Sequence, residues 1–341
     1  MAGIFTISLD FELHWGVFDK RDRQAREACY KNTLRIIPQM LELFAQYEVH
    51  VTWATVGSLF AHNQQEWEQF SPAVEPDYEV ERYSAYKWVR QHGMPEQYKW
   101  AHFAPEEVAM ILQYPGQELA THTFSHYYCL ENQREQRAFD ADLKAAVKAA
   151  EKYKAPLRSL VFPRNQFNPD YLKICFANGI KTVRSNPASW YWTPVSNGGT
   201  SLFRKLFRTA DAYIQTGKER TSYPLETIKA IPGEPLQLPA SRFMRPWRSK
   251  YKFANKLRLR RLCQELRSAA IHNEVYHLWW HPENFGDYPE QNLKSLKILL
   301  QHYKKYKEKY GMTSWNMGEY VDHFYGKQEE HPVKMAESIL Q

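Results

Sequence analysis

The sequence predicts an α/β protein built on a parallel sheet, and two observations favour this fold class. Short apolar strands alternate with amphipathic helices along almost all of the 341 residues. Several of the strands end in ionisable side chains, as the strands of barrels and doubly wound sheets do at their carboxyl ends. Because the alternation is nearly continuous, we expect one domain with insertions rather than two domains.

The first part of the chain shows this alternation clearly. Runs of β-branched and apolar residues predict buried strands, and apolar residues that repeat at three and four positions predict helices. The expected elements are a strand at 3–9, a helix at 26–47, a strand at 49–56, a helix from Gly57, a helix at 105–114 and a strand at 118–121. From about 64 to 102 the periodicity is lost and aromatic residues mix with charges. This stretch predicts an insertion, either a lid or a structural excursion that packs on the fold.

The second part continues the pattern as far as about residue 330. We expect a long helix after Leu130, strands at 159–162, 180–183, 236–239, 274–280 and 312–315, and helices at 171–178 and 293–306. Residues 185–260 form a second expected insertion, which ends in a basic stretch from Arg242 to Arg261. The predicted domain is therefore 1–330, with insertions at 64–102 and 185–260 and a C-terminal tail at 331–341.

Composition limits the function further. The net charge of +7 favours an anionic partner, such as a phosphate or an anionic membrane face contacted peripherally, and the basic stretch offers it a surface. The alternative is a solvated helix face. Charge alone supports nucleic-acid binding, and we expect none. The four scattered cysteines, the absence of a signal peptide and the absence of a long apolar run predict a cytoplasmic protein. Aromatic residues make up 15% of the chain, which indicates either a carbohydrate-lining surface or an aromatic core.

The stretch from Glu118 to His126 carries the strongest chemical signal. His122 and His126 are four residues apart, so in a helical turn both imidazoles would face one divalent ion. A catalytic zinc site usually has three protein ligands and an open position, so a third ligand must come from elsewhere. Asp10 and Glu12 end the first strand, and their alternation places both carboxylates on one face.

Two further strand ends carry Arg164 and His281. If all strands are parallel, these groups meet the carboxylates and the histidine pair at one rim. One carboxylate and two histidines would bind a metal ion, and the other carboxylate would be a general base. A histidine on the far side would be a general acid, and an arginine would hold the base ionised. Such a site suits hydrolysis of an amide or an ester.

On these residues the chain resembles the polysaccharide deacetylases of the NodB-homology type, carbohydrate esterase family 4, over roughly residues 3–324. His122-Thr123-Phe124-Ser125-His126 is similar to the family's metal motif, and Thr6-Ile7-Ser8-Leu9-Asp10-Phe11-Glu12 to its first motif. Phe162-Pro163-Arg164 resembles the arginine motif, and Leu278-Trp279-Trp280-His281 the late histidine motif. The variant resembles the branch associated with bacterial surface-polysaccharide and O-antigen biosynthesis.

The resemblance implies a distorted (β/α) barrel of about seven parallel strands and a bound Zn²⁺ or similar divalent ion. It implies Asp10 as the base, His281 as the acid, Arg164 as the catalytic arginine, and a metal ligand set of Glu12, His122 and His126. The chain departs from the family pattern in three ways. The second acid of the first motif is a glutamate two residues after Asp10, so the two acids could exchange roles. Arg164 follows its proline rather than preceding it, and no aspartate near 184–192 matches the family's aspartate that orients the acid histidine.

The function expected from the resemblance is N-deacetylation of an acetamido sugar. The substrate would be a nucleotide- or lipid-linked precursor of a bacterial surface polysaccharide, O-antigen or capsule. A deformylase or another small-amide hydrolase on the same fold is an alternative, and a non-catalytic glycan-binding relative is another.

Overall fold

The fold is organised around a nine-stranded sheet within the described part of the chain. The structure, a computed structural model, describes residues 2–131, 136–187, 189–196, 201–211 and 221–326. The strands are β1 (Ile4–Phe11), β2 (Val51–Thr55), β3 (Gln117–Thr121), β4 (Ser159–Val161), β5 (Thr182–Ser185), β6 (Leu236–Pro239), β7 (Arg242–Phe243), β8 (Val275–Trp280) and β9 (Thr313–Ser314). Among these strands the ladder pairings run parallel, in the order β6-β5-β4-β3-β2-β1-β8-β7, with β9 added on β1.

The two ends of this sheet are joined through the chain itself. Only two residues separate β6, which pairs with β5, from β7, which pairs with β8. The amide of Ala240 donates to the Ser185 carbonyl at 2.9 Å, and the amide of Ser241 donates to the His277 carbonyl at 2.8 Å. Strands β6 and β7 therefore act as one bent strand that closes the sheet into a distorted barrel. Its wall has seven strand positions when β6 and β7 are counted as one and β9, which is added on β1, is left out. The predicted fold class is confirmed.

Strand β1 lies in the middle of the barrel and positions the first chemical groups. All eight of its residues are buried, as expected for a parallel strand covered on both faces. It pairs with β2 on one side and with β8 on the other, so the carboxyl ends of the three strands lie at the same rim. Asp10 is the second-last residue of β1, and Glu12 directly follows the strand.

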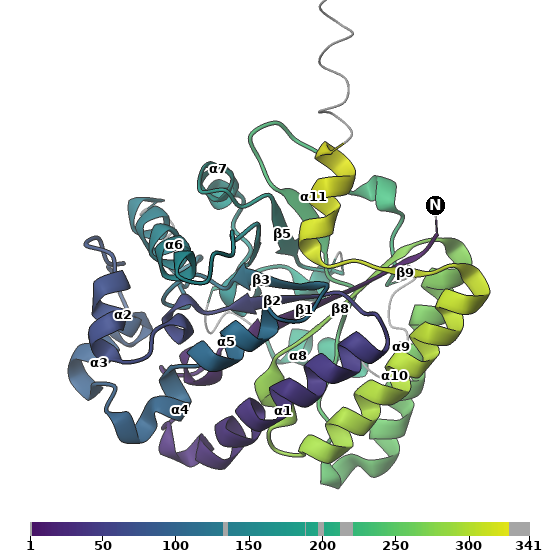
Figure 1. The fold of residues 1–341 in the computed structure, drawn as a ribbon, viewed down its shortest axis with the longest axis horizontal. Helices are drawn as coiled ribbons and strands as arrows, with labels where there is room; N and C mark the ends of the chain where they lie inside the picture. Colours follow the sequence, from purple (N-terminus) through teal and green to yellow (C-terminus); the bar gives the residue numbers. More distant parts are fainter. Residues whose placement is uncertain (1, 132–135, 188, 197–200, 212–220, 327–341) are drawn as a thin grey trace, which may run out of the picture.

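Helices surround the barrel (Figure 1). They are α1 (Glu27–Gln46), α2 (Gln64–Phe70), α3 (Ala85–His92), α4 (Lys99–His102), α5 (Pro105–Ile111), α6 (Gln136–Glu151), α7 (Leu172–Ala177), α8 (Leu202–Ala210), α9 (Lys252–His272), α10 (Pro289–Tyr310) and α11 (Met317–Tyr325). Helices α5, α1, α10 and α9 follow one another along one side of the strands. Helix α11 lies against the amino-terminal strand ends, where Gly318 donates its amide to Glu118 at 2.9 Å and Tyr320 bonds Thr6 at 2.7 Å. The opposite end of the barrel, where the strands have their carboxyl ends, is not covered by this helix and is where the candidate site lies.

The stretch 64–102 packs into the core of the protein. It contains α2, α3 and α4, which are too short to show a clear helical period. Its aromatic residues Trp67, Tyr83 and Tyr86 are buried, and Trp67 stacks on Trp15 of the loop after β1. This stretch is therefore a structural excursion that packs on the fold, and most of its large aromatic side chains are part of the hydrophobic core or pack against it.

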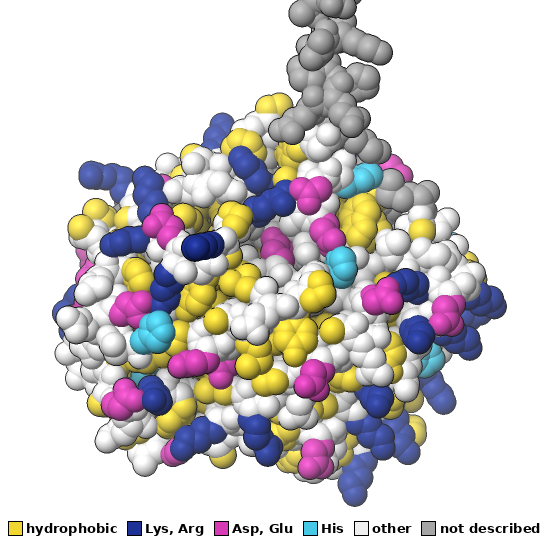
Figure 2. Space-filling model, in the orientation of Figure 1, with side chains coloured by type: hydrophobic (Ala, Val, Ile, Leu, Met, Phe, Trp, Pro, Cys, Tyr) yellow, Lys and Arg dark blue, Asp and Glu magenta, His cyan; other side chains and the backbone are white. Residues whose placement is uncertain are grey.

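The basic stretch divides into a buried and an exposed part. Arg242 is buried and bonds both Asp211 and Glu265, and Glu265 also accepts from Arg261. Other basic side chains of α9 and of α10 remain on the surface, and dark blue side chains gather at the lower right of Figure 2 where Figure 1 shows these helices. Part of the predicted basic surface is therefore neutralised inside the protein. The tail at 331–341 lies outside the described residues.

Two smaller expectations concern cysteines and membranes. Cys29, Cys129, Cys175 and Cys263 are buried free thiols, as their spacing indicated. None of the helices among the described residues combines the length and the apolar composition needed to cross a bilayer.

A buried histidine of α4 makes the fold sensitive to acid. His102 accepts a hydrogen bond from Arg23 at 3.1 Å, and burial, with His14 and Arg23 nearby, holds its pKa well below the ordinary value. Below about pH 6.5 the unfolded chain therefore binds a proton that the folded chain does not, and stability falls as pH decreases. We expect the change from pH 7 to pH 5 to cost about 2 kcal/mol through this residue.

Urea unfolding at both pH values checks this expectation. His102→Gln keeps an acceptor for Arg23 and should lose about that much of the pH dependence, whereas His272→Gln, at an exposed histidine of α9, should not. Equal pH dependence in the wild type and His102→Gln would show that His102 does not contribute.

Candidate metal centre and active site

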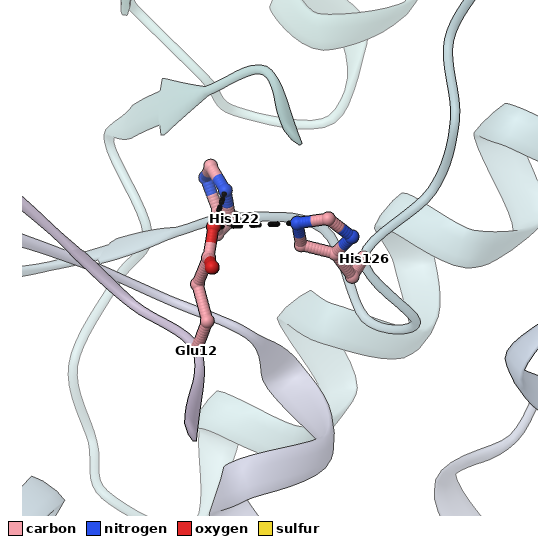
Figure 3. Close-up of side chains that lie close together, drawn as sticks. All are labelled: Glu12, His122 and His126. Carbon is pink, nitrogen blue, oxygen red and sulfur yellow. Dashed lines mark hydrogen bonds and ion pairs between the residues drawn. The ribbon is translucent and has the colours of Figure 1, made fainter. Parts of the chain in front are cut away.

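Three predicted ligands meet at the carboxyl end of the barrel. The Nε2 atoms of His122 and His126 lie 3.0 and 3.3 Å from the same oxygen of Glu12, Oε1. In Figure 3 the glutamate rises from the end of β1, and the two imidazoles come from the loop after β3. All three side chains are buried, and one ligand atom from each lies within 4.8 Å of the others. Two nitrogens and one carboxylate oxygen form a donor set typical of catalytic zinc sites.

The protonation states of this group suit a metal ion. Burial acts to raise the pKa of Glu12, but His281, His126 and the hydrogen bonds from both loop histidines hold it well below its ordinary value. Burial lowers the pKa of His126 to about 4. A metal ligand must be an ionised carboxylate or a neutral imidazole, so these residues fit a divalent ion such as Zn²⁺.

The histidine pair lies in a loop rather than on a helix, so the predicted helical turn is wrong. Thr123 and His126 both have left-handed backbone conformations, with φ of 63° and 58°. Asp142 of α6 is buried behind the loop, where it accepts the amides of Phe124 at 2.7 Å and Ser125 at 3.3 Å, and the Ser125 hydroxyl. This side chain of α6 satisfies the loop backbone and brings both imidazoles to Glu12.

Two other residues hold Glu12 in place. A Cβ atom at Gly16 would lie only 1.8 Å from Oε2 of Glu12, so a larger residue would displace the carboxylate. Glu283, which follows β8, accepts the amides of Glu12 at 3.0 Å and Leu13 at 2.5 Å. Burial and the neighbouring Glu12 raise the pKa of Glu283 to about 8. These contacts fix the turn through Leu13, whose φ is 47°.

Asp10 forms a two-bonded ion pair with Arg184 of β5. The Arg184 Nη1 and Nη2 atoms donate to the two oxygens of Asp10 at 2.6 and 2.7 Å. The same guanidinium donates to Ser8 at 3.0 Å and lies over the Trp279 ring, 4.4 Å from its centroid. An arginine in this position orients the carboxylate through two parallel, charge-assisted hydrogen bonds. Asp10 and Glu12 therefore differ in their surroundings, which favours Glu12 as the ligand and Asp10 as the base.

The arginine that contacts Asp10 is not the one predicted. Arg164 and Asn165 follow β4 in left-handed conformations, with φ of 56° and 53°. This turn directs Arg164 to Asp19, at 2.7 Å, and to the carbonyl of Gly16, at 3.2 Å. Asn165 takes part in the site instead by accepting from Arg184 at 3.2 Å. In the structure the contact with Asp10 that was expected for Arg164 is therefore made by Arg184.

His281 faces both carboxylates from the end of β8. Its Nε2 atom lies 3.8 Å from Asp10 Oδ2 and 3.6 Å from Glu12 Oε1. Its Nδ1 atom lies 3.2 Å from Nδ2 of Asn284. Its side chain is partly exposed, at 28%, so a substrate can reach it.

Sequence reasoning missed Arg184, Asp142 and Glu283. Arg184 was visible as a basic residue at the end of a predicted strand, a signal equal to that of Arg164. Asp142 and Glu283 carried no distinct signal, because an acid within a helix or beside a proline is usually solvated.

The comparisons with known proteins concern the family and the fold of the chain. The polysaccharide deacetylase family model matches residues 29–183. The predicted resemblance to the polysaccharide deacetylases is confirmed. The range matched by the deacetylase model contains His122 and His126 but not Asp10, Glu12 or His281. No curated protein sequence matches the chain.

Several solved structures share the barrel fold of this chain. A candidate polysaccharide deacetylase from Mycobacterium smegmatis aligns with a TM-score of 0.58 at 12% identity, over 96% of this chain and 92% of the other. Puue allantoinase aligns at 0.53 and 10% identity, over 94% and 91%. The 4-alpha-glucanotransferase from Thermococcus litoralis aligns at 0.54 and 13% identity, over 95% of this chain but 41% of its own. At these identities the likeness concerns the fold alone.

Proposed function

We propose that this protein is a metal-dependent hydrolase that removes the acetyl group from an acetamido sugar in a precursor of a bacterial surface polysaccharide. The observation that carries the proposal is the convergence of Glu12, His122 and His126 beside an Asp10 that is paired with Arg184. The family resemblance supports deacetylation. The ligand set would hold Zn²⁺ or another divalent ion, which supplies Lewis acidity for attack of water on an amide.

The remaining side chains have complementary tasks in such a reaction. Asp10 accepts a proton from the attacking water, and Arg184 keeps the carboxylate oriented. His281 lies on the exposed side of both carboxylates and donates a proton to the departing nitrogen. The amide C–N bond breaks, and acetate and a free amino sugar leave.

Acetate release from a panel of amides tests this proposal. The zinc-loaded protein should release acetate from an acetamido sugar faster than it hydrolyses a formamido sugar or a non-sugar amide. Asp10→Asn should lower the turnover number by about 10²- to 10⁴-fold because the general base is lost. Metal content should stay near the wild-type value because Glu12, His122 and His126 are unchanged.

The control is Asp170→Asn, at an exposed aspartate outside the site, which should keep full turnover. Faster hydrolysis of the formamido sugar would favour the deformylase alternative. Glycan binding without any acetate release in the wild type would favour the non-catalytic alternative.

A further inference from the structure

A cleft opens directly beside the metal centre. The empty space in it and in the solvent at its mouth amounts to about 1120 Å³, and Glu12, His281 and Glu283 form part of its lining. The rest comes mainly from two segments that are far apart in sequence: residues 16–30 after β1, and residues 246–248 before α9. A substrate whose amide reaches His281 therefore extends along these two segments.

Arginines are the most numerous charged residues of this cleft, which also contains the acids Glu12, Glu283 and Asp287. Four of them line it, and two of the four are neutralised: Arg26 bonds Asp287 at 3.0 Å, and Arg164 bonds Asp19 at 2.7 Å. Arg21 and Arg248 are exposed, and neither guanidinium has a carboxylate within 4.0 Å among the described residues. Two positive charges therefore remain available to a ligand in the cleft.

The segment that carries Arg248 is held by buried side chains. Asn255 of α9 accepts the Arg248 amide at 3.3 Å and donates to the Arg248 carbonyl at 2.7 Å. Asn292 of α10 accepts the amide of Trp247 at 2.7 Å. Both asparagines are buried. Two buried amides thus fix the backbone of a surface segment, which lowers the entropy cost when its side chains bind a ligand.

An aromatic pair stands beside these charges. The rings of Trp247 and Tyr288 meet edge to face with centroids 5.0 Å apart, and both line the cleft. The Tyr288 hydroxyl bonds Ser249 at 2.9 Å. Aromatic surface next to cationic groups suits a ligand that has an apolar face and an anionic group, such as a sugar phosphate.

We propose that the substrate is a phosphate-bearing acetamido sugar, whose phosphate or diphosphate is bound by Arg21 and Arg248 while the sugar packs against Trp247. This inference rests on the proposed function and specifies its substrate class. A guanidinium fork matches phosphate oxygens, and Arg21 and Arg248 line the same cleft from two different segments. The phosphate can belong to a nucleotide-linked or to a lipid-linked sugar, because the recognised chemistry is the same.

Direct binding tests the inference without turnover. The zinc-loaded wild type should bind N-acetylglucosamine 1-phosphate more tightly than N-acetylglucosamine in calorimetry, and binding should weaken as salt increases. Arg21→Gln and Arg248→Gln should each weaken phosphate-sugar binding by about fivefold or more and leave binding of the neutral sugar unchanged. The matched control is Arg260→Gln, at an exposed arginine of α9 that does not line the cleft, which should bind like the wild type.

Turnover then separates the two phosphate sources. The KM values of a nucleoside-diphosphate-linked and a polyprenyl-diphosphate-linked acetamido sugar are compared, and the sugar with the lower KM is taken as the better substrate. In the two variants, the KM of this substrate should rise more than the KM of the free sugar. If both variants bound the phosphate sugar with the affinity of the wild type, the anion would bind at the metal ion or elsewhere, and the inference would be overturned. Acetate release from neutral and phosphorylated sugars alike, unchanged in both variants, would overturn it while the proposed function stands. Arginine-dependent binding without acetate release would support the anion site and contradict deacetylation.

Discussion

Replacement of His126 by alanine is expected to remove the bound divalent ion together with all acetate release. His126 supplies one of three ligand atoms, and the two that remain, from Glu12 and His122, leave the ion mostly hydrated. Loss of an outer-shell partner typically costs 10- to 100-fold in metal affinity, so loss of a direct ligand should cost more than about 100-fold. Elemental analysis of the purified protein, before and after zinc reconstitution, measures this directly.

The chain provides a matched control for the His126 variant. His102 is equally buried but lies outside the ligand group, so His102→Ala removes a buried imidazole and should retain about one ion per chain. Metal that remained bound to His126→Ala at wild-type strength would contradict the assigned ligand set. Chelation of the wild type should abolish acetate release, and added zinc should restore it.

Replacement of Arg184 by methionine is expected to lower both stability and turnover. Arg184 and Asp10 form a buried ion pair, and removal of one partner from such a pair typically costs about 3–5 kcal/mol of folding free energy. The turnover number should fall by about 10²-fold or more, because Asp10 loses the group that aims it. Arg184→Lys restores the charge but not the two parallel hydrogen bonds, so we expect part of the stability to return and turnover to remain low.

Two other arginines distinguish positioning from stability. Arg242 is also buried and bonds two acids, Asp211 and Glu265, away from the ligand group, so Arg242→Met should reduce stability while the folded protein keeps its turnover number. Arg164→Met should have the smaller effect on turnover, because Arg164 contacts Asp19 rather than Asp10. If Arg164→Met reduced turnover more than Arg184→Met did, the assignment of the orienting arginine would be wrong. Denaturant unfolding and steady-state kinetics on the same samples separate the two effects.

Several features of the site could be predicted because they depend on short-range patterns. The alternation of apolar residues indicated most strands, including β1 and β8, and their polar ends indicated which groups would share a rim. Parallel pairing then brings strand ends together whatever the details of packing, which is why Asp10, Glu12, His122, His126 and His281 were found together.

The arginine shows where such patterns become insufficient. Arg164 follows β4 and Arg184 lies in β5 of the same sheet, and in the sequence each stands at the end of a predicted strand, so their sequence signals are equivalent. The choice between them depends on the left-handed turn at Arg164 and Asn165, which directs the first guanidinium to Asp19. Whether two consecutive residues adopt that conformation depends on their surroundings, since it is unfavourable for residues other than glycine.

The sequence alone predicted the fold class, the polar side chains that end each strand and the residue types of the candidate metal ligands. These features follow from periodicity and from residue identity. Tertiary structure decided the partner of Asp10, the loop geometry set by Asp142, the closure of the barrel through residues 236–243, and the cleft between Arg21 and Arg248. Each of these depends on contacts between segments separated by many residues, and local sequence does not encode which distant side chain satisfies a buried charge or a free amide.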